Sequence, residues 1–262
     1  MGCYSSLMKI VTWNVNSIKA RIEHVKDWLA TKKPDVMMLQ ELKGAEFPEM
    51  EFKAFGYNCA FVAQKAYNGV ATLSTHTIEI NETKLPGDAG DEQARYLETT
   101  INGLRFINIY LPNGNPVDSD KLPYKLSWMD RLKARLAALR DDTIPFAVAG
   151  DFNVIPEARD CYDPKAWTED ALFRTETRQK FRALLNLGLT DAFRVFNTQS
   201  AQYTYWDYQA GAWPANKGIR IDHFLLSPPV TDRLEGCFID TAPRGLDKAS
   251  DHTPVVVELR NS

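Results

Sequence analysis

The sequence predicts an α/β fold in which two mixed β-sheets pack face to face and helices lie on their outer sides. Short apolar runs rich in Val, Ile and Phe, bounded by polar or turn residues, are typical of buried strands. Segments with helical periodicity lie between these runs. Two neighbouring segments, 95–102 and 104–110, meet at Asn102 and Gly103 as the arms of a hairpin would, so the sheets are expected to be mixed.

The strands are expected at residues 9–13, 35–39, 105–111, 145–149, 221–226 and 254–259. A first helix, capped by Ser17 and ending before Pro34, would bury one apolar face: Ile18, Ile22, Val25 and Leu29. A long helix is expected at about 120–140, where Leu and Met recur at three- and four-residue steps, and a third near 176–187. No repeat or linker interrupts the pattern, so residues 8–260 are expected to form one domain.

The composition excludes several classes of protein. Of 262 residues, 44% are hydrophobic and 25% are charged, which is too apolar for a disordered chain. No apolar run is long enough to span a bilayer. The net charge of −3 means that any nucleic-acid surface must be local. The four cysteines have no C-x-x-C spacing, which favours reduced thiols in a cytoplasm over a zinc or disulfide framework.

Residues 1–7 are expected to be a disordered extension before a natural start at Met8. The same residues fit the short myristoylation pattern, with Cys3 as a second acylation site. We favour the extension because so short a motif often occurs by chance.

Polar side chains follow the expected strands at the points where these strands end. They are Asn14 and Asn16, Glu41, Tyr110 and Asn113, and Asp151 and Asn153. Asp222 instead opens a strand, and Asp251 and His252 immediately precede the last one. If those two strands run antiparallel to the others, all of these side chains reach one edge of the sheets, where α/β folds commonly build sites.

The residue types at this edge indicate metal-assisted phosphate chemistry. Glu41 and Asp251 offer hard carboxylate oxygens that suit Mg²⁺ or Mn²⁺ rather than zinc. Asp151 and the metal could share the activation of water and the stabilisation of a leaving alkoxide. Asp222 could fix the tautomer of His252 and favour its protonated form. Hydrogen bonds to a pentacovalent phosphate could come from Tyr110, Asn113, Asn153 and His252.

Together these segments resemble the exonuclease III family of abasic endonucleases, within the endonuclease/exonuclease/phosphatase superfamily, and the bacterial type in particular. The resemblance runs in order from about residue 8 to 260. It rests on the segments Trp13-Asn14-Val15-Asn16, Leu39-Gln40-Glu41-Leu42-Lys43, Asn68-Gly69-Val70-Ala71, Tyr110-Leu111-Pro112-Asn113, Gly150-Asp151-Phe152-Asn153-Val154, Arg220-Ile221-Asp222 and Ser250-Asp251-His252.

The resemblance implies a four-layer α/β sandwich and a Mg²⁺-dependent monomer in the bacterial cytoplasm. Such an enzyme cuts duplex DNA 5′ to abasic sites, leaves a 3′-hydroxyl, and also acts on 3′ ends as an exonuclease, phosphatase or phosphodiesterase. The implied catalytic residues are Asp151, His252, Asp222, Tyr110 and Asn153. Substrate would contact Asn113, Tyr205, Trp206 and Asn14, and Tyr205 and Trp206 would form part of the wall around the extruded sugar. The metal would be held by Glu41, Asn14, Asp251, Asp151 and Asn153.

The sequence also departs from the animal members of this family. Where they insert an Arg and a Met into the duplex, the matching positions are Pro116 and Gln209. A large aromatic of their sugar pocket is replaced by Ile219, and the Thr that commonly follows the metal-binding Glu is replaced by Leu42. These differences are expected to change how the protein contacts the duplex at the lesion, and the balance of exonuclease to endonuclease activity. The catalytic chemistry is expected to be unchanged.

Two other functions remain open from the sequence. One is a phosphoesterase of the same fold with another substrate, such as a sphingomyelinase, an inositol-phosphate phosphatase, an RNA deadenylase or a pancreatic deoxyribonuclease-like nuclease. Several of these use a second histidine soon after the strand that ends here in Tyr110, and this segment has none. The other is a DNA-binding module without catalysis, which predicts gaps in the carboxylate and amide set, and the sequence has none.

Overall fold

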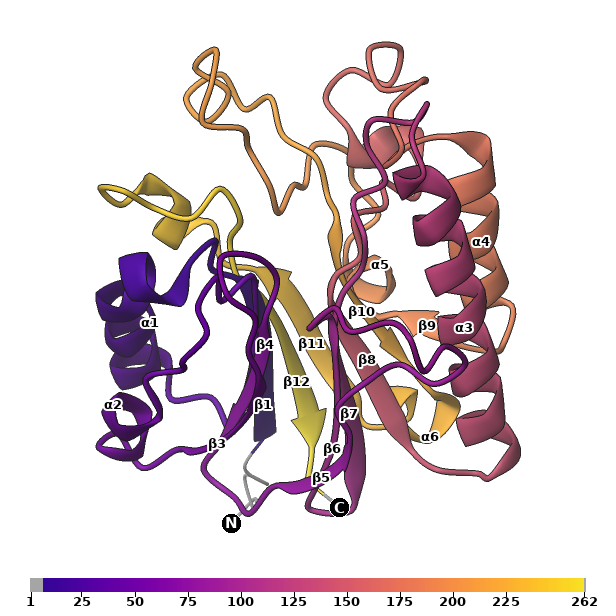
Figure 1. Ribbon diagram of the computed structural model, residues 1–262. Helices are drawn as coiled ribbons and strands as arrows, with labels where there is room; N and C mark the ends of the chain where they lie inside the picture. Colours follow the sequence, from indigo (N-terminus) through magenta and orange to yellow (C-terminus); the bar gives the residue numbers. More distant parts are fainter. Residues whose placement is uncertain (1–6, 262) are drawn as a thin grey trace.

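The computed structural model describes residues 7–261 and contains two six-stranded β-sheets (Figure 1). The first sheet has the order β11 (Leu234–Ile239), β12 (Val255–Arg260), β1 (Leu7–Asn14), β2 (Val36–Gln40), β4 (Val70–Ser74) and β3 (Asn58–Val62). The second has the order β5 (Glu79–Glu82), β6 (Tyr96–Ile101), β7 (Leu104–Tyr110), β8 (Phe146–Asp151), β10 (Asp222–Leu226) and β9 (Thr190–Asp191). Both sheets are mixed, as the sequence predicts.

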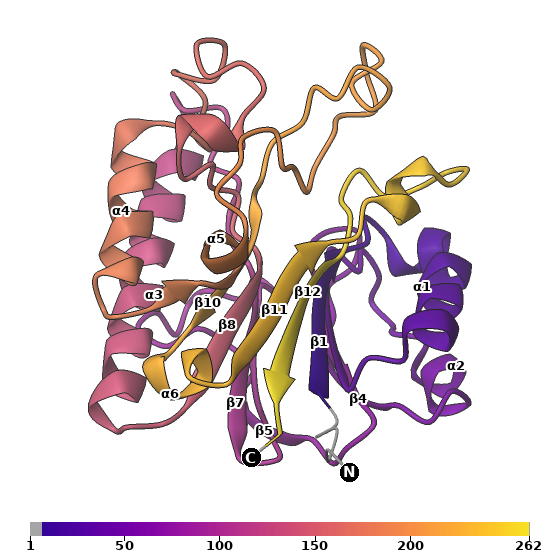
Figure 2. The same cartoon turned by 180° about the vertical axis from the view of Figure 1, so that it is seen from behind.

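Helices cover the outer faces of both sheets, as the views from the two sides show (Figures 1 and 2). The first sheet carries α1 (Ile18–Lys32) and α2 (Glu49–Lys53), and the second carries α3 (Lys121–Asp141) and α4 (Thr175–Leu185). The shorter helices are α5 (Ala192–Phe196) and α6 (Pro228–Thr231), and 3₁₀ turns lie at Ala158–Asp160 and Ala242–Gly245. The expected four-layer α/β sandwich is confirmed.

Three large apolar clusters, among several in the described part of the chain, pack the layers together. The central core lies between the sheets, where Ile10 and Val257 of the first sheet belong to one cluster with Phe106 of the second. A second core joins α3 and α4 to their sheet, and a third joins α1 and α2 to theirs. Removal of this apolar surface from water is the main favourable term that keeps the layers packed.

The local sequence signals act as expected in most elements. Ser17 caps α1 by accepting a hydrogen bond from the Ala20 amide, and the helix ends at the left-handed Lys33, before Pro34. The expected hairpin forms between β6 and β7, which turn at Asn102 and Gly103. In contrast, β1 begins at Leu7, which pairs with Arg260, so the first sheet takes in the last residue of the expected extension. Residues 1–6, with the acylation pattern, lie outside the described residues.

Two strands run in the direction that the convergence of polar residues requires. Strand β10 pairs antiparallel with β8, and β12 pairs antiparallel with β1. The beginnings of β10 and β12 therefore lie at the same edge as the ends of β8 and β1. Within residues 7–261, no helix has the length and apolar character to cross a membrane.

Candidate active site

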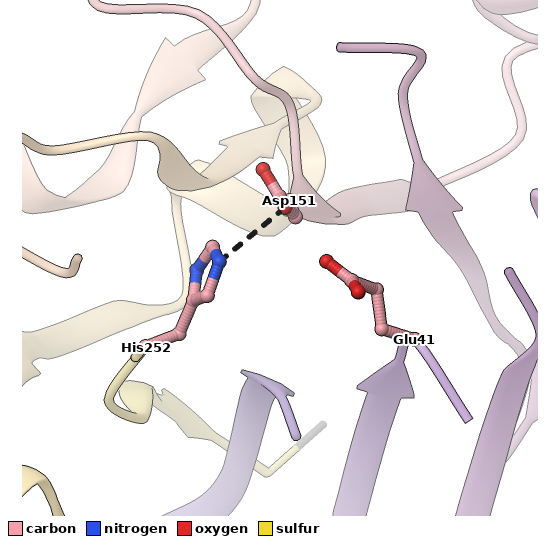
Figure 3. A group of neighbouring side chains, drawn as sticks. All are labelled: Glu41, Asp151 and His252. Carbon is pink, nitrogen blue, oxygen red and sulfur yellow. Dashed lines mark ion pairs between the residues drawn. The ribbon is translucent and has the colours of Figure 1, made fainter. Parts of the chain in front are cut away.

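The expected site residues gather at this shared edge and come from both sheets. Register pairing places Asp222, the first residue of β10, directly opposite Asp151, the last residue of β8. Glu41 follows the end of β2, and His252 precedes β12. Figure 3 shows Glu41, Asp151 and His252 facing one another across the boundary between the sheets.

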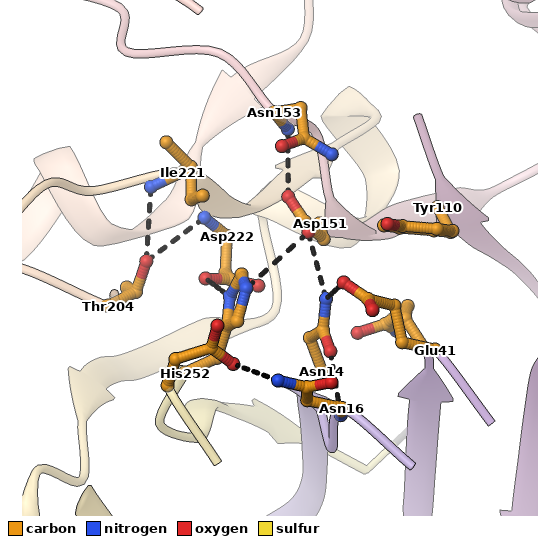
Figure 4. Close-up of polar contacts among 12 residues, drawn as sticks. Asn14, Asn16, Glu41, Tyr110, Asp151, Asn153, Thr204, Ile221, Asp222 and His252 are labelled. Carbon is orange, nitrogen blue, oxygen red and sulfur yellow. Dashed lines mark hydrogen bonds and ion pairs between the residues drawn. The ribbon is translucent and has the colours of Figure 1, made fainter. Parts of the chain in front are cut away.

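The amide of Asn14 connects the two sheets at this point. Its Nδ2 donates hydrogen bonds to Oε1 of Glu41 at 2.8 Å and to Oδ2 of Asp151 at 2.9 Å (Figure 4). Asn14 is fully buried, and its Oδ1 accepts a hydrogen bond from the Asn16 backbone amide at 3.0 Å. All polar atoms of this side chain are thereby paired, so the amide holds two carboxylates at a fixed separation.

Asp151 lies in an environment that disfavours its charged form. Its side chain is 1% exposed and follows Gly150, where an added Cβ would lie 1.9 Å from the Ile109 carbonyl oxygen, so only glycine fits. Burial raises the pKa of Asp151 above its usual range; the carboxylates of Asp222 and Glu41 act in the same direction, while His252 opposes them. A carboxylate in this state is a stronger base than one in water.

His252 and Asp222 form the expected pair. Nδ1 of His252 lies 2.9 Å from Oδ2 of Asp222, and Nε2 lies 3.7 Å from Oδ2 of Asp151. Burial acts to lower the pKa of His252, but the two carboxylates outweigh it and raise the pKa to about 10. The imidazole is therefore a cation at neutral pH, with Nε2 directed toward Asp151.

Thr204 holds the start of β10 in place, a role that sequence reasoning did not assign. Its Oγ1 accepts hydrogen bonds from the backbone amides of Ile221 and Asp222, each at 3.1 Å (Figure 4). Trp13 acts similarly on the other partner, because its Nε1 donates to the His252 carbonyl oxygen at 3.2 Å. These contacts hold the main chain at both Asp222 and His252.

A second group of donors lies on the β7 and β8 side. Nδ2 of Asn113 donates to Oδ1 of Asn153 at 3.2 Å, and Nδ2 of Asn153 donates to the Leu111 carbonyl oxygen at 2.8 Å. Burial, with the charges of Glu41 and Asp151, raises the pKa of Tyr110 well above its usual value. Its phenol is therefore a hydrogen-bond donor at any physiological pH.

The carboxylates of Glu41 and Asp151 lie close enough together to hold a metal ion. One ligand atom each from Glu41, Asp151 and His252 lie within 4.8 Å of one another. Burial acts to raise the pKa of Glu41, but hydrogen bonds from Lys43 and Asn14 outweigh it and lower the pKa, so this carboxylate is ionised. Asp251 is adjacent and accepts a hydrogen bond from Asn16 at 3.0 Å.

A cavity of about 240 Å³ opens onto these groups. Eight expected residues or their neighbours line it: Glu41, Tyr110, Asn113, Asp151, Asn153, Tyr205, Asp251 and His252. Its remaining walls come from residues to which the sequence assigned no role in the site: Asn115, Trp167, Asp170, Leu172 and Ile221. The Tyr205 ring packs edge-on against the His252 ring, with centroids 5.0 Å apart.

Trp206 has a different position from the one expected. Its side chain is 2% exposed and packs with Tyr203 and Trp213, and it lines a separate hollow beside α5 and β11. Its backbone amide bonds the Asp251 carbonyl oxygen at 2.9 Å, so Trp206 supports the loop that carries Asp251 and does not contribute to the wall of the site cavity. The apolar part of the wall of the site cavity is formed instead by Leu172, Trp167 and Ile221.

Comparisons with known proteins agree with this fold and site. The model of the Endonuclease/Exonuclease/phosphatase family matches residues 11–252, and the chain belongs to that family. Exodeoxyribonuclease III of Haemophilus influenzae is 31% identical, over 97% of this chain and 100% of that protein. The chain is a hydrolytic nuclease of the exodeoxyribonuclease III type.

Two solved structures are similar over nearly their full lengths. An AP endonuclease from Archaeoglobus fulgidus has a TM-score of 0.93 and 36% identity, covering 97% of this chain and 100% of that one. The 3′ phosphatase NExo from Neisseria, in complex with a product DNA hairpin, has a TM-score of 0.92 and 38% identity, covering 96% and 99%.

Proposed function

We propose that the protein is a Mg²⁺-dependent DNA repair phosphodiesterase. It cuts duplex DNA on the 5′ side of abasic sites, leaves a 3′-hydroxyl, and also removes phosphate, blocking groups and nucleotides from 3′ ends. The observation that carries the proposal is one cavity in which the buried base Asp151 faces the cation His252 and the donors Tyr110, Asn113 and Asn153. The names of the similar proteins, an exodeoxyribonuclease, an AP endonuclease and a 3′ phosphatase, support DNA as the substrate.

In the proposed reaction a water molecule attacks phosphorus in a single step, and the bond from phosphorus to the 3′-oxygen breaks. Asp151 orients the water and accepts its proton, and the leaving 3′-oxygen takes up a proton from solvent to become the 3′-hydroxyl. His252, held protonated by Asp222, stabilises the negative charge that grows on a non-bridging phosphate oxygen. Tyr110, Asn113 and Asn153 donate hydrogen bonds to the other oxygens, and Tyr205 and Ile221 pack against the sugar.

The residues at the acidic end fit a Mg²⁺ ion. Oxygen atoms of carboxylates and amides are the ligands that this ion prefers, and Glu41 is ionised with 14% of its side chain exposed. His252 is unsuitable as a ligand because its ring is protonated and bonded to Asp222. We assign the metal to Glu41, with Asp251 and Asp151 beside it. The two expected amide ligands would have to give up present contacts to take part, because Oδ1 of Asn14 accepts from the Asn16 amide and Oδ1 of Asn153 accepts from Asn113. When bound, Mg²⁺ would supply positive charge next to the phosphate and the leaving oxygen.

The test uses an end-labelled duplex with one tetrahydrofuran abasic analogue, an undamaged duplex, and a duplex with a 3′-phosphate, each incubated with Mg²⁺. A single cut 5′ to the analogue, with the undamaged duplex intact, is the expected result. Release of phosphate or nucleotides from 3′ ends alone would restrict the function to end processing. Cleavage of none of the three would contradict the proposal and favour another phosphoester substrate of this family.

Binding provides an independent check on DNA as the substrate. Because Lys and Arg that neutralise phosphates release counterions, the affinity for the abasic duplex should fall as salt is raised. An affinity that does not change with salt would argue against a DNA partner. We further propose that the protein acts as a monomer in the bacterial cytoplasm, which sedimentation and cell fractionation can test.

A further inference from the structure

Lys125 on α3 is a fully buried lysine that lies directly behind the site cavity. Its side chain is 0% exposed, although the neighbouring residues 121, 123 and 127 of the same helix are exposed. Its Nζ donates hydrogen bonds to the backbone carbonyl oxygens of Asn113, at 2.9 Å, and of Asn153, at 2.5 Å. A single side chain thus bonds the main chain of both cavity asparagines.

Lys125 can donate to both carbonyl oxygens in either protonation state. Burial lowers the pKa of Lys125 to about 7, while the charges of Asp151 and Asp170 act in the opposite direction. Both acceptors are neutral carbonyl oxygens, and a neutral amine still has two N–H groups to donate to them, although an ammonium forms the stronger bonds. Burial of a lysine is costly, so its presence here needs a reason other than stability of the core.

The main chain around Lys125 is shaped to admit it. Gly114, next to Asn113, has a φ of +92°, and an added Cβ there would lie 2.7 Å from Cδ of Lys125 and 3.0 Å from Cβ of Ala171. Asn153 also has a positive φ, of +48°. The Asn153 turn therefore has a backbone conformation that is costly for a residue other than glycine, whereas glycine supplies the positive φ of the Asn113 turn; Nζ of Lys125 hydrogen-bonds both turns.

We propose that Lys125 is a positioning residue that clamps the Asn113 and Asn153 turns together and so fixes the spacing of their amide donors around the phosphate. The inference rests on the proposed function, because it assigns these amides to the phosphate. Without the clamp, Oδ1 of Asn153 and Nδ2 of Asn113 lose the fixed geometry in which they now meet at 3.2 Å. Displaced amide donors should stabilise the transition state less, while the affinity for the DNA should change little.

The first measurement compares Lys125→Met with wild type and with Lys133→Met, an exposed lysine on the same helix. Steady-state cleavage of the abasic duplex is measured at a temperature at which circular dichroism shows every variant folded. Lys125→Met is expected to lower kcat roughly 10- to 100-fold, with KM changed by about twofold or less. Lys133→Met should match wild type.

A double-mutant cycle separates positioning from general destabilisation. If Lys125 acts through Asn153, then adding Lys125→Met to Asn153→Ala should cost much less in kcat than it costs in the wild-type background. A merely structural role gives the same fold-loss in both backgrounds. Lys125→Gln, a polar replacement for use where Lys125→Met does not fold, can reach one carbonyl and is expected to keep part of the activity.

A folded Lys125→Met or Lys125→Gln variant with the kcat of wild type would overturn the proposed positioning role. So would an equal fold-loss in kcat when Lys125→Met is added to wild type and to Asn153→Ala. Failure of the proposed function has a different signature, because wild type itself would then cleave none of the DNA substrates. A loss seen as a higher KM with unchanged kcat would also contradict the inference, since it would place Lys125 in DNA binding.

Discussion

Nδ1 of His252 lies 2.9 Å from Oδ2 of Asp222 in a site where both side chains are almost fully buried. Burial alone would remove the proton from His252, and the Asp222 carboxylate is the largest influence that keeps it there. The positive charge of His252 therefore depends on the Asp222 carboxylate.

Asp222→Asn should lower kcat by about 100-fold or more, because His252 loses the charge that holds its proton. The pKa of His252 is raised to about 10 in the wild type, so protonated enzyme persists until the pH rises through that value. Removal of Asp222 lowers this pKa, so the alkaline loss of activity should begin at lower pH. A pH–rate profile checks the shift, and an alkaline limb unmoved in the variant would rule out this role of Asp222.

Asp151→Asn should abolish most cleavage, by about 10³-fold, and yet raise the melting temperature in EDTA. The pKa of Asp151 is higher in the folded protein than in an unfolded chain, where it is near 4. Its ionisation at neutral pH therefore costs stability, and a neutral amide removes that cost. Calorimetry and single-turnover cleavage measure the two effects. A less stable variant would show that the carboxylate contributes more through its hydrogen bonds than it costs through burial.

Removal of divalent metal by EDTA should abolish cleavage, and Mg²⁺ or Mn²⁺ should restore it. Glu41→Gln keeps the shape of the side chain but removes the charge that the structure holds ionised. The Mg²⁺ concentration for half-maximal activity should rise by about 10- to 100-fold. Full activity after exhaustive chelation, or an unchanged Mg²⁺ requirement in Glu41→Gln, would contradict the metal assignment.

Wild-type stability should fall as the pH drops from about 6.5 toward 4, in part because of His223. This residue is 1% exposed, its Nε2 bonds the Val154 carbonyl oxygen at 2.9 Å, and burial lowers its pKa to about 4. The unfolded chain takes up the proton first, so folding loses up to about 3 kcal/mol across this range. Urea unfolding of wild type and His223→Gln at pH 7 and pH 5 measures the difference. Equal losses in both proteins would exclude His223 as a source.

The central strands and long helices were predictable because their signals are strong. Strands β1, β8 and β12 each contain a short run of mostly apolar residues, and α3 places Leu or Met at three- and four-residue steps. The predicted set lacked β3, β4, β5, β9 and β11 and the short helices α2, α5 and α6. Strands β3, β5 and β11 are largely exposed or half-exposed and carry no clear alternation, and the short helices and β9 span too few residues for periodicity to register. Strand β4 is fully buried, but Thr72 and Ser74 interrupt its apolar residues. Such elements depend on the sheets and helices against which they pack.

The site was predictable to the extent that its residues follow strands. Sequence position does not reveal walls built from irregular loops, so Trp167 and Leu172 were not expected in the cavity. The family resemblance placed Trp206 in this wall beside Tyr205, but neighbouring residues in an extended segment point in opposite directions. Lys125 gave no signal at all, since a lysine on an amphipathic helix ordinarily reaches water.

The bridge from Asn14 to Asp151 joins the first strand of the chain to a strand more than a hundred residues later, and His252 comes only ten residues before the end. No contiguous half of the polypeptide contains a complete site. During synthesis, cutting ability can therefore arise only after β12 has left the ribosome and docked beside β1. A chain that stops before β12, or in which β12 has not yet paired with β1, cannot hold His252 opposite Asp151 and lacks a complete site.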